Sequence, residues 1–175
     1  MFSFLKNMSK SNRALLLTCF FAFFSNGALS LTMGSVMPDL KAAYGLSDTV
    51  SGLFLSAHSA GNLIAGFVSA LIPLYLGERR SITLLASLQA IMLMSSLGFI
   101  GFLMMTLWGN PVWLLLAFAC TGLGRGSVTN FDNRMVNRLS GGNPAASNML
   151  HGSFAIGAIL APLAFLGLRN LMGWR

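Results

Sequence analysis

The sequence predicts an all-α membrane protein with about five transmembrane helices. Of its 175 residues, 55% are hydrophobic and only 9% are charged, so there are too few charges to cover a water-facing surface. Several apolar runs reach about the 20 residues that cross a bilayer as a helix. We therefore expect residues 14–175 to form a transmembrane helical bundle, preceded by a cytoplasmic N-terminal segment, residues 1–13.

The net charge of +7 would suggest nucleic-acid binding in a soluble domain. Here the basic residues lie mostly between apolar runs, which is typical of the cytoplasmic loops of membrane proteins. We therefore expect the lipid bilayer as a partner and no nucleic acid. The two cysteines, Cys19 and Cys120, lie within predicted spans without metal-ligand spacing, and we expect both to be buried thiols.

The first span is predicted over residues 14–37. Its basic start is similar to that of a signal peptide, but the apolar run is too long for a signal core and further apolar runs follow. We expect the helix to end at Pro38–Asp39. Asn26 shares a helical side with Ser30, so it either lines a cavity or joins two helices through a hydrogen bond.

The second span is predicted over residues 47–76, with Ser47 as the N-cap. His58 and Asn62 share a stripe of this helix, among small residues that would let another helix approach closely. For His58 two interpretations remain open: a packing residue with a satisfied hydrogen bond, or a proton carrier.

The third span, residues 82–107, is predicted to be peripheral because Gln89 is its main polar residue. Arg79 and Arg80 precede it, whereas the link that follows it carries no charge. Basic residues also lie in the N-terminal segment and after the fourth span. This alternation predicts an integral membrane protein with its N-terminus in the cytoplasm.

The fourth span, residues 113–137, has a small and polar half. At about 100° per residue, one narrow sector holds two glycines and four polar residues, and Arg125 with Asp132 forms a sector beside it. The residues of the first sector are Gly122, Gly126, Thr129, Asn130, Asn133 and Asn137. We expect this half to face other helices or a wet cavity.

The fifth span is predicted over residues 146–168, after a turn at residues 140–144 that is rich in glycine and proline. Asn148 and His151 share one side of this helix with Ala155 and Ala158. Because these neighbours are small, we expect His151 to face a cavity.

Asp132 is the only carboxylate that we expect at membrane depth. Arg125 is two turns earlier, about 10 Å away along the axis, which is too far for direct contact. Two interpretations of Asp132 remain open: a proton carrier, or the partner of a cytoplasmic base, which would be Arg134, Arg138 or the Arg79–Arg80 turn.

The layout of five spans resembles the N-terminal half of a major facilitator superfamily transporter. Residues 38–40, Pro-Asp-Leu, and 45–47, Gly-Leu-Ser, lie between spans one and two as is common in that superfamily. Its signature loop between spans two and three is partly present, since Gly77 and Arg79 match while Leu74 replaces the acid.

Spans four and five resemble the fucose/galactose/glucose-proton symporter family. The resemblance is carried by Gly-x-Gly-x-Gly at residues 122–126, Asn133-x-x-Val136 and Asn148-x-x-His151. It implies secondary transport of a small polar, sugar-like solute with protons, in the inner membrane of a bacterium.

Two other functions remain as alternatives. Gly157-x-x-x-Ala161-Pro162 is also similar to the antiporter motif of drug-proton exchangers, which would make the chain half of an efflux protein. The third possibility is a non-transporting membrane fragment that packs against a partner.

The available side chains favour transport and not catalysis. No motif indicates a nucleophile with its base, a phosphate loop, a metal cluster or a cofactor, so we expect no enzyme and neither metal nor cofactor. The candidates for solute binding are Asn26, Asn62, Asn130, Asn133, Asn148 and His151. The candidates for proton coupling or gating are Asp132, Arg125 and His58.

Transporters of this superfamily resemble two six-span bundles around a central site, and residues 173–175 resemble the lead-in to a sixth span. We therefore expect the chain to be a truncated reading frame or one piece of a split transporter, which associates with a second half or another copy. Alone, it is expected not to transport.

Overall fold

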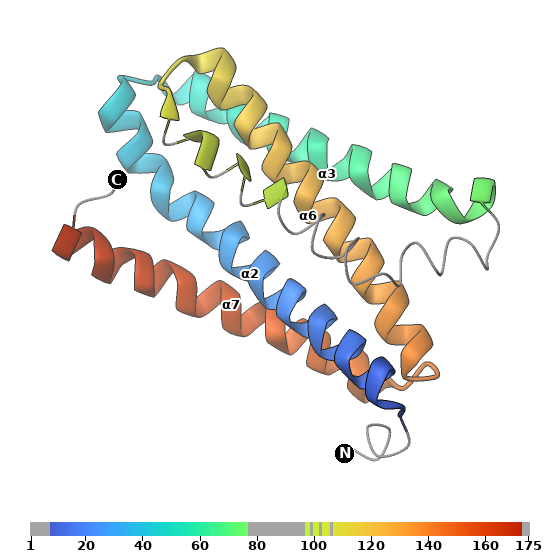
Figure 1. Cartoon of the computed structure of the whole chain (residues 1–175). Coiled ribbons are helices and arrows are strands. Elements are labelled where there is room, and N and C mark those ends of the chain that lie inside the picture. Colours follow the sequence, from blue (N-terminus) through green and yellow to red (C-terminus); the bar gives the residue numbers. More distant parts are fainter. Residues whose placement is uncertain (1–7, 77–96, 99, 102, 106, 173–175) are drawn as a thin grey trace.

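The computed structural model describes residues 8–76, 97–98, 100–101, 103–105 and 107–172. Within these residues the regular structure is entirely helical, which confirms the all-α class for this part of the chain. Its long helices are α2 (Lys10–Tyr44), α3 (Asp48–Leu76), α6 (Pro111–Leu139) and α7 (Pro144–Met172) (Figure 1).

Three helices of the described part are long and apolar enough to cross a membrane: Lys10–Tyr44, Pro111–Leu139 and Pro144–Leu171. A helix of 29 residues is about 43 Å long, whereas the hydrocarbon core of a bilayer is about 30 Å thick. The third expected span, 82–107, lies mostly outside the described residues, as does the turn at 77–80. The count of about five spans therefore stays a prediction.

The prediction that Pro38–Asp39 ends the first span is wrong. α2 continues to Tyr44, and its C-cap Gly45 has a φ of 61° with its amide bonded to the Lys41 carbonyl. A proline inside a helix costs about 3 kcal/mol. Beyond it Leu40 is completely buried, which contributes about 1.5–3 kcal/mol, so tertiary packing offsets the proline.

The other helix ends follow local capping rules. The amide of Val50 donates to the Ser47 hydroxyl at 3.3 Å, as expected of an N-cap. α6 begins slightly before its expected start, because Asn110 caps it and Pro111 occupies its first turn. The expected turn between α6 and α7 is confirmed, with Gly141 and Gly142 at φ 63° and 77°.

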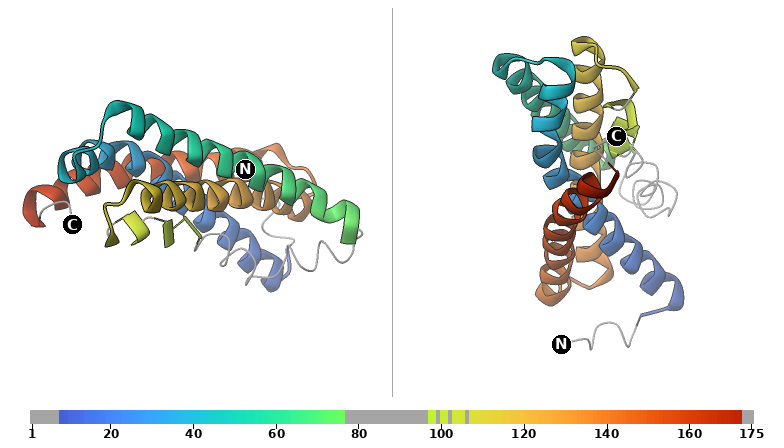
Figure 2. Two further views of the ribbon diagram at one scale, coloured as in Figure 1. Left: turned by 90° about the horizontal axis from the view of Figure 1, so that it is seen from above. Right: turned by 90° about the vertical axis from the view of Figure 1, so that its left-hand side faces the viewer.

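The helices pack as two pairs, α2 with α7 and α3 with α6, and the two pairs meet mainly where α2 contacts α6 (Figure 1). Seen from above, α3 crosses α6 at an angle (Figure 2). Gly122 lies against the backbone of His58, and Gly157 against the backbone of Phe24, so a side chain at either glycine would collide with the partner helix. Small residues thus allow close contact within each pair.

Two apolar clusters form the core. The first joins α2, α6 and α7 around Leu16, Phe131 and Leu150. The second joins α2, α3 and α6 around Leu40 and Phe54, together with Met105. In α2 and in α6 a short polar stretch lies between the residues of the two clusters, and this stretch contains the candidate site.

Outward-facing side chains of α3 and α7 are large and apolar. Phe67 is 64% exposed, Leu63 61%, Ile159 63% and Leu163 61%. A surface of this kind is compatible with contact to lipid tails, and it supports a membrane location.

Candidate functional site

The polar layer lies at half height in the bundle. Asn26 is within a residue of the midpoint of α2, and Arg125 is at the midpoint of α6. Arg125 is therefore about 20 Å from either end of its helix along the axis. Polar groups at this depth are expensive in a membrane and commonly mark solute or ion pathways.

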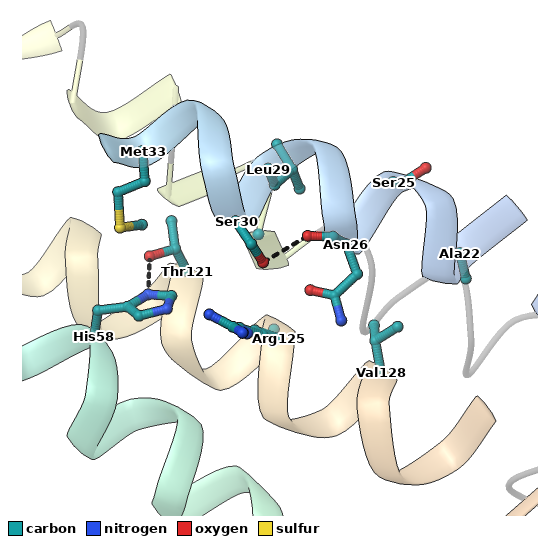
Figure 3. Close-up of a pocket in the computed structure, with 12 residues that line it drawn as sticks. Ala22, Ser25, Asn26, Leu29, Ser30, Met33, His58, Thr121, Arg125 and Val128 are labelled. Atoms are coloured by element: carbon teal, nitrogen blue, oxygen red, sulfur yellow. Dashed lines mark hydrogen bonds between the residues drawn. The ribbon is translucent and has the colours of Figure 1, made fainter. Parts of the chain in front are cut away.

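A small cavity occupies this layer, between α2, α3 and α6 (Figure 3). Its volume available to water is about 20 Å³. One water molecule needs about 10–15 Å³ by this measure, so the space accommodates a water but not a sugar. The polar residues that line it are Ser25, Asn26, Ser30, His58, Thr121 and Arg125.

Asn26 joins α2 to α6 at the edge of the cavity. Its side-chain amide donates to the Thr129 hydroxyl at 3.1 Å, and that hydroxyl donates to the Arg125 carbonyl at 2.8 Å. Ser30 donates to the Asn26 backbone carbonyl at 2.6 Å. Both interpretations of Asn26 therefore have a basis, since it lines a cavity and also links two helices.

His58 reaches the cavity from α3. The side chain is 9% exposed, and its Nδ1 lies 2.9 Å from the Thr121 hydroxyl. Thr121 also donates to the Phe118 carbonyl at 2.7 Å. The ring is thus satisfied on one side by α6, while its other side faces the space that contains Arg125 (Figure 3).

The Arg125 side chain lies between His58 and Asn26 (Figure 3). It is half-buried and forms no ion pair with any acid in the described part of the chain. Its five N–H donors therefore face the cavity without a protein counter-charge from these residues.

Asp132 is fully buried but does not line the cavity. Neither carboxyl oxygen has a hydrogen-bond partner among the described residues. The Cys19 thiol interacts with it from α2, and the apolar side chains of the first cluster surround that thiol. A pairing of Asp132 with Arg134 or Arg138 does not occur, and both arginines are exposed. The third possible partner, the Arg79–Arg80 turn, lies outside the described residues.

Three further candidates, on α3 and α6, lie outside the cavity. The Asn130 side-chain amide donates to the Gly66 carbonyl at 3.1 Å and to the Ser69 hydroxyl at 3.0 Å. Asn133 donates to the Thr129 carbonyl of its own helix at 2.8 Å. The Asn62 carbonyl lies against Gly126. The contacts of Asn130 and Asn62 join α3 to α6, whereas the hydrogen bond of Asn133 lies within α6. None of the three residues lines the cavity.

Asn148 and His151 lie on an exposed part of α7. The His151 ring contacts Phe23 of α2 edge-on, with centroids 5.6 Å apart. Neither residue lines the cavity, so a role in solute binding would involve a separate surface.

Of the nine candidates, Asn26, His58 and Arg125 come together in one cavity. Sequence reasoning did not select Thr121, although it precedes Arg125 by one helical turn and so shares its face. It also did not pair Cys19 with Asp132, because nothing in the spacing of the two residues indicates their contact.

Comparison with known proteins adds no relative, since no protein family, curated protein or solved structure matches the chain. The function is therefore argued from the helices and the central cavity alone.

Proposed function

We propose that this chain is part of a secondary transporter of the major facilitator type, which carries a small polar, sugar-like solute together with protons. The observation that carries this proposal is the polar cavity at half height, built from α2, α3 and α6. A bundle that served only as a packing partner would have no need of an arginine, a histidine and an asparagine at that depth, where each is costly.

The volume of the cavity supports a mechanism of alternating access. A space of about 20 Å³ is too small for a sugar, so a solute can enter only if the helices around it move apart. The contact between α2 and α6 is less extensive than the contacts within each helix pair. Movement of one pair relative to the other would enlarge the cavity without separating either pair.

We propose Asp132 as the residue that holds the transported proton. Asp132 has no exposure, and its one polar neighbour among the described residues is the Cys19 thiol. Such a carboxyl group is expected to be neutral, because a buried carboxylate without a counter-charge is very unfavourable. Movement of α2 against α6 would bring water to this group and allow it to ionise. Proton binding and solute access would then depend on the same helix contact.

Solute binding tests the proposal directly. We expect the purified chain in lipid nanodiscs to bind radiolabelled hexose sugars or their acids, and the Asn26→Leu variant to bind them about tenfold to a hundredfold more weakly if the amide contacts the solute. Asn12→Leu is the matched control, because Asn12 is an exposed residue of the same helix.

The same assay separates the alternatives. Binding of apolar cationic dyes in place of sugars would favour the drug-proton exchanger. If neither class bound, the chain would be a packing component and the transport proposal would be wrong.

Infrared spectroscopy tests the role of Asp132. At neutral pH we expect the chain to show the carbonyl stretch of one protonated carboxylic acid, and Asp132→Asn to lack it. Asp39→Asn is the control, since Asp39 differs from Asp132 in being paired with an arginine, Arg169, at 2.8 Å. A band that survives in Asp132→Asn would assign the proton to another group.

A further inference from the structure

The charge of Arg125 has no compensating acid in the described part of the protein. The sequence contains four acidic residues. Asp39 pairs with Arg169, and Asp48 pairs with Lys41. Two acids therefore remain: Asp132, which does not line the cavity, and Glu78, which lies outside the described residues.

Asp132 lies two turns beyond Arg125 on the same helix, about 10 Å along its axis, and does not line the cavity. No acid among the described residues is therefore positioned to neutralise Arg125.

A bare guanidinium at half height in a membrane is unfavourable, so a ligand that supplies the opposite charge gains more there than at a wet surface. Guanidinium groups bind carboxylates in a bidentate manner, with two parallel hydrogen bonds. Beside Arg125 the cavity offers the Asn26 amide and the Ser30 hydroxyl, which can bind hydroxyl groups of the same ligand.

We propose that the solute is an acidic one, a hydroxylated carboxylic acid such as an acidic sugar, whose carboxylate pairs with Arg125. This inference rests on the proposed transport function and specifies its substrate class. A neutral sugar would leave the charge of Arg125 uncompensated when the cavity closes around it, whereas an acidic sugar neutralises it. Arg125 would therefore select a negatively charged solute, and the Asn26 amide and the Ser30 hydroxyl would select one that carries hydroxyl groups.

Glucuronate and glucose are suitable probes, because they share a ring and differ in a carboxylate at the terminal carbon. We expect the unmodified chain in lipid nanodiscs to bind glucuronate roughly tenfold to a hundredfold more tightly than glucose, the range for hydrogen bonds to charged groups. This comparison requires no variant and is independent of any effect of substitution on folding.

Variants then test whether Arg125 causes the preference for glucuronate over glucose. We expect Arg125→Gln to lower the affinity for glucuronate to that for glucose. Arg125→Lys keeps the positive charge but loses the planar guanidinium with its paired N–H donors, so it should retain part of the difference in affinity between the two probes. Arg134→Gln is the matched control, because Arg134 is an exposed arginine of the same helix. Circular dichroism of each variant checks that the helices are retained.

The outcomes distinguish this inference from the proposed function. Equal binding of both probes, lost in Asn26→Leu, would keep the polar-solute site and overturn the acidic class. If the chain bound neither probe, both ideas would be overturned for hexoses. If Arg125→Gln instead dissociated a complex of chains, the counter-charge would come from a protein, and the acidic solute would be wrong.

Discussion

The tautomer of His58 follows from the hydrogen bonds of Thr121. The threonine hydroxyl has one proton, which it donates to the Phe118 carbonyl at 2.7 Å. Its oxygen can therefore only accept from the His58 ring, so Nδ1, at 2.9 Å, carries a proton. In the neutral ring, Nε2 is then left as an acceptor.

This assignment predicts different effects for two similar substitutions. We expect His58→Asn to retain more stability than His58→Gln, because the asparagine amide can occupy the position of Nδ1–H while the glutamine amide reaches towards Nε2. The difference in free energy of unfolding should be about 0.5–1.5 kcal/mol, measured by detergent-induced unfolding followed by circular dichroism.

Ser59→Ala is a control for that experiment, since Ser59 is exposed and bonds only its own helix. Equal losses in the two histidine variants would contradict the tautomer.

The sequence allowed the positions of polar side chains to be predicted better than their partners. A helical wheel placed Asn26 with Ser30, and His58 with Asn62, because burial repeats with the helical period. Contacts such as Cys19 with Asp132 depend on the rotation of α2 about its axis relative to α6. That rotation results from the packing of all side chains between the two helices. It cannot be derived from the periodicity of either helix alone.

At the scale of helices, close contact between α2 and α7 depends on glycine. A side chain at Gly157 would collide with the backbone of Phe24, whereas Gly152, on the same helix, has no atom within 4 Å of the equivalent position. We expect Gly157→Val to lower the free energy of unfolding by about 1–3 kcal/mol through overpacking. Gly152→Val should change it by less than about 0.5 kcal/mol.

Detergent-induced unfolding measures both variants under the same conditions. Similar effects would show that α2 and α7 are not in close contact, since only Gly157 meets the backbone of the neighbouring helix.

Helix boundaries were predictable where capping residues determine them and not where packing does. Ser47 caps α3 as its sequence indicates. The end of α2 was misplaced because Pro38 is a local signal, while the residues that keep the helix intact act over long range. Leu40 joins the second apolar cluster, and Asp39 pairs with Arg169 of α7.

At the scale of the whole bundle, the charges of the described residues differ between its two ends. α2 begins at the end where α6 finishes (Figure 1), so Lys10 and Arg13 share that end with Arg134 and Arg138. At the opposite end Lys41 is neutralised by an acid, as is Arg169 by Asp39. An excess of basic charge is typical of the cytoplasmic side, and the orientation with this end in the cytoplasm stays a prediction.

Cysteine labelling tests this orientation. In a Cys19→Ala, Cys120→Ala background, we expect Ser140→Cys to react with an impermeant thiol reagent only from the cytoplasmic side. Ala42→Cys, which is also an exposed position, should react only from the opposite side. Reaction of the second variant from the cytoplasm would contradict the topology.

The ion pair between Asp39 and Arg169 lies near the C-terminal ends of α2 and α7, while Gly27 and Gly157 interlock the same helices near their middles. Because these two contacts are far apart along the helices, they prevent α2 from rotating relative to α7. We therefore expect α2 and α7 to move as one rigid body, which would rotate about the contact of α2 with α6. A small rotation there would displace the ends of the two helices more than their middles, so a path would open at one end of the bundle as the central cavity widens.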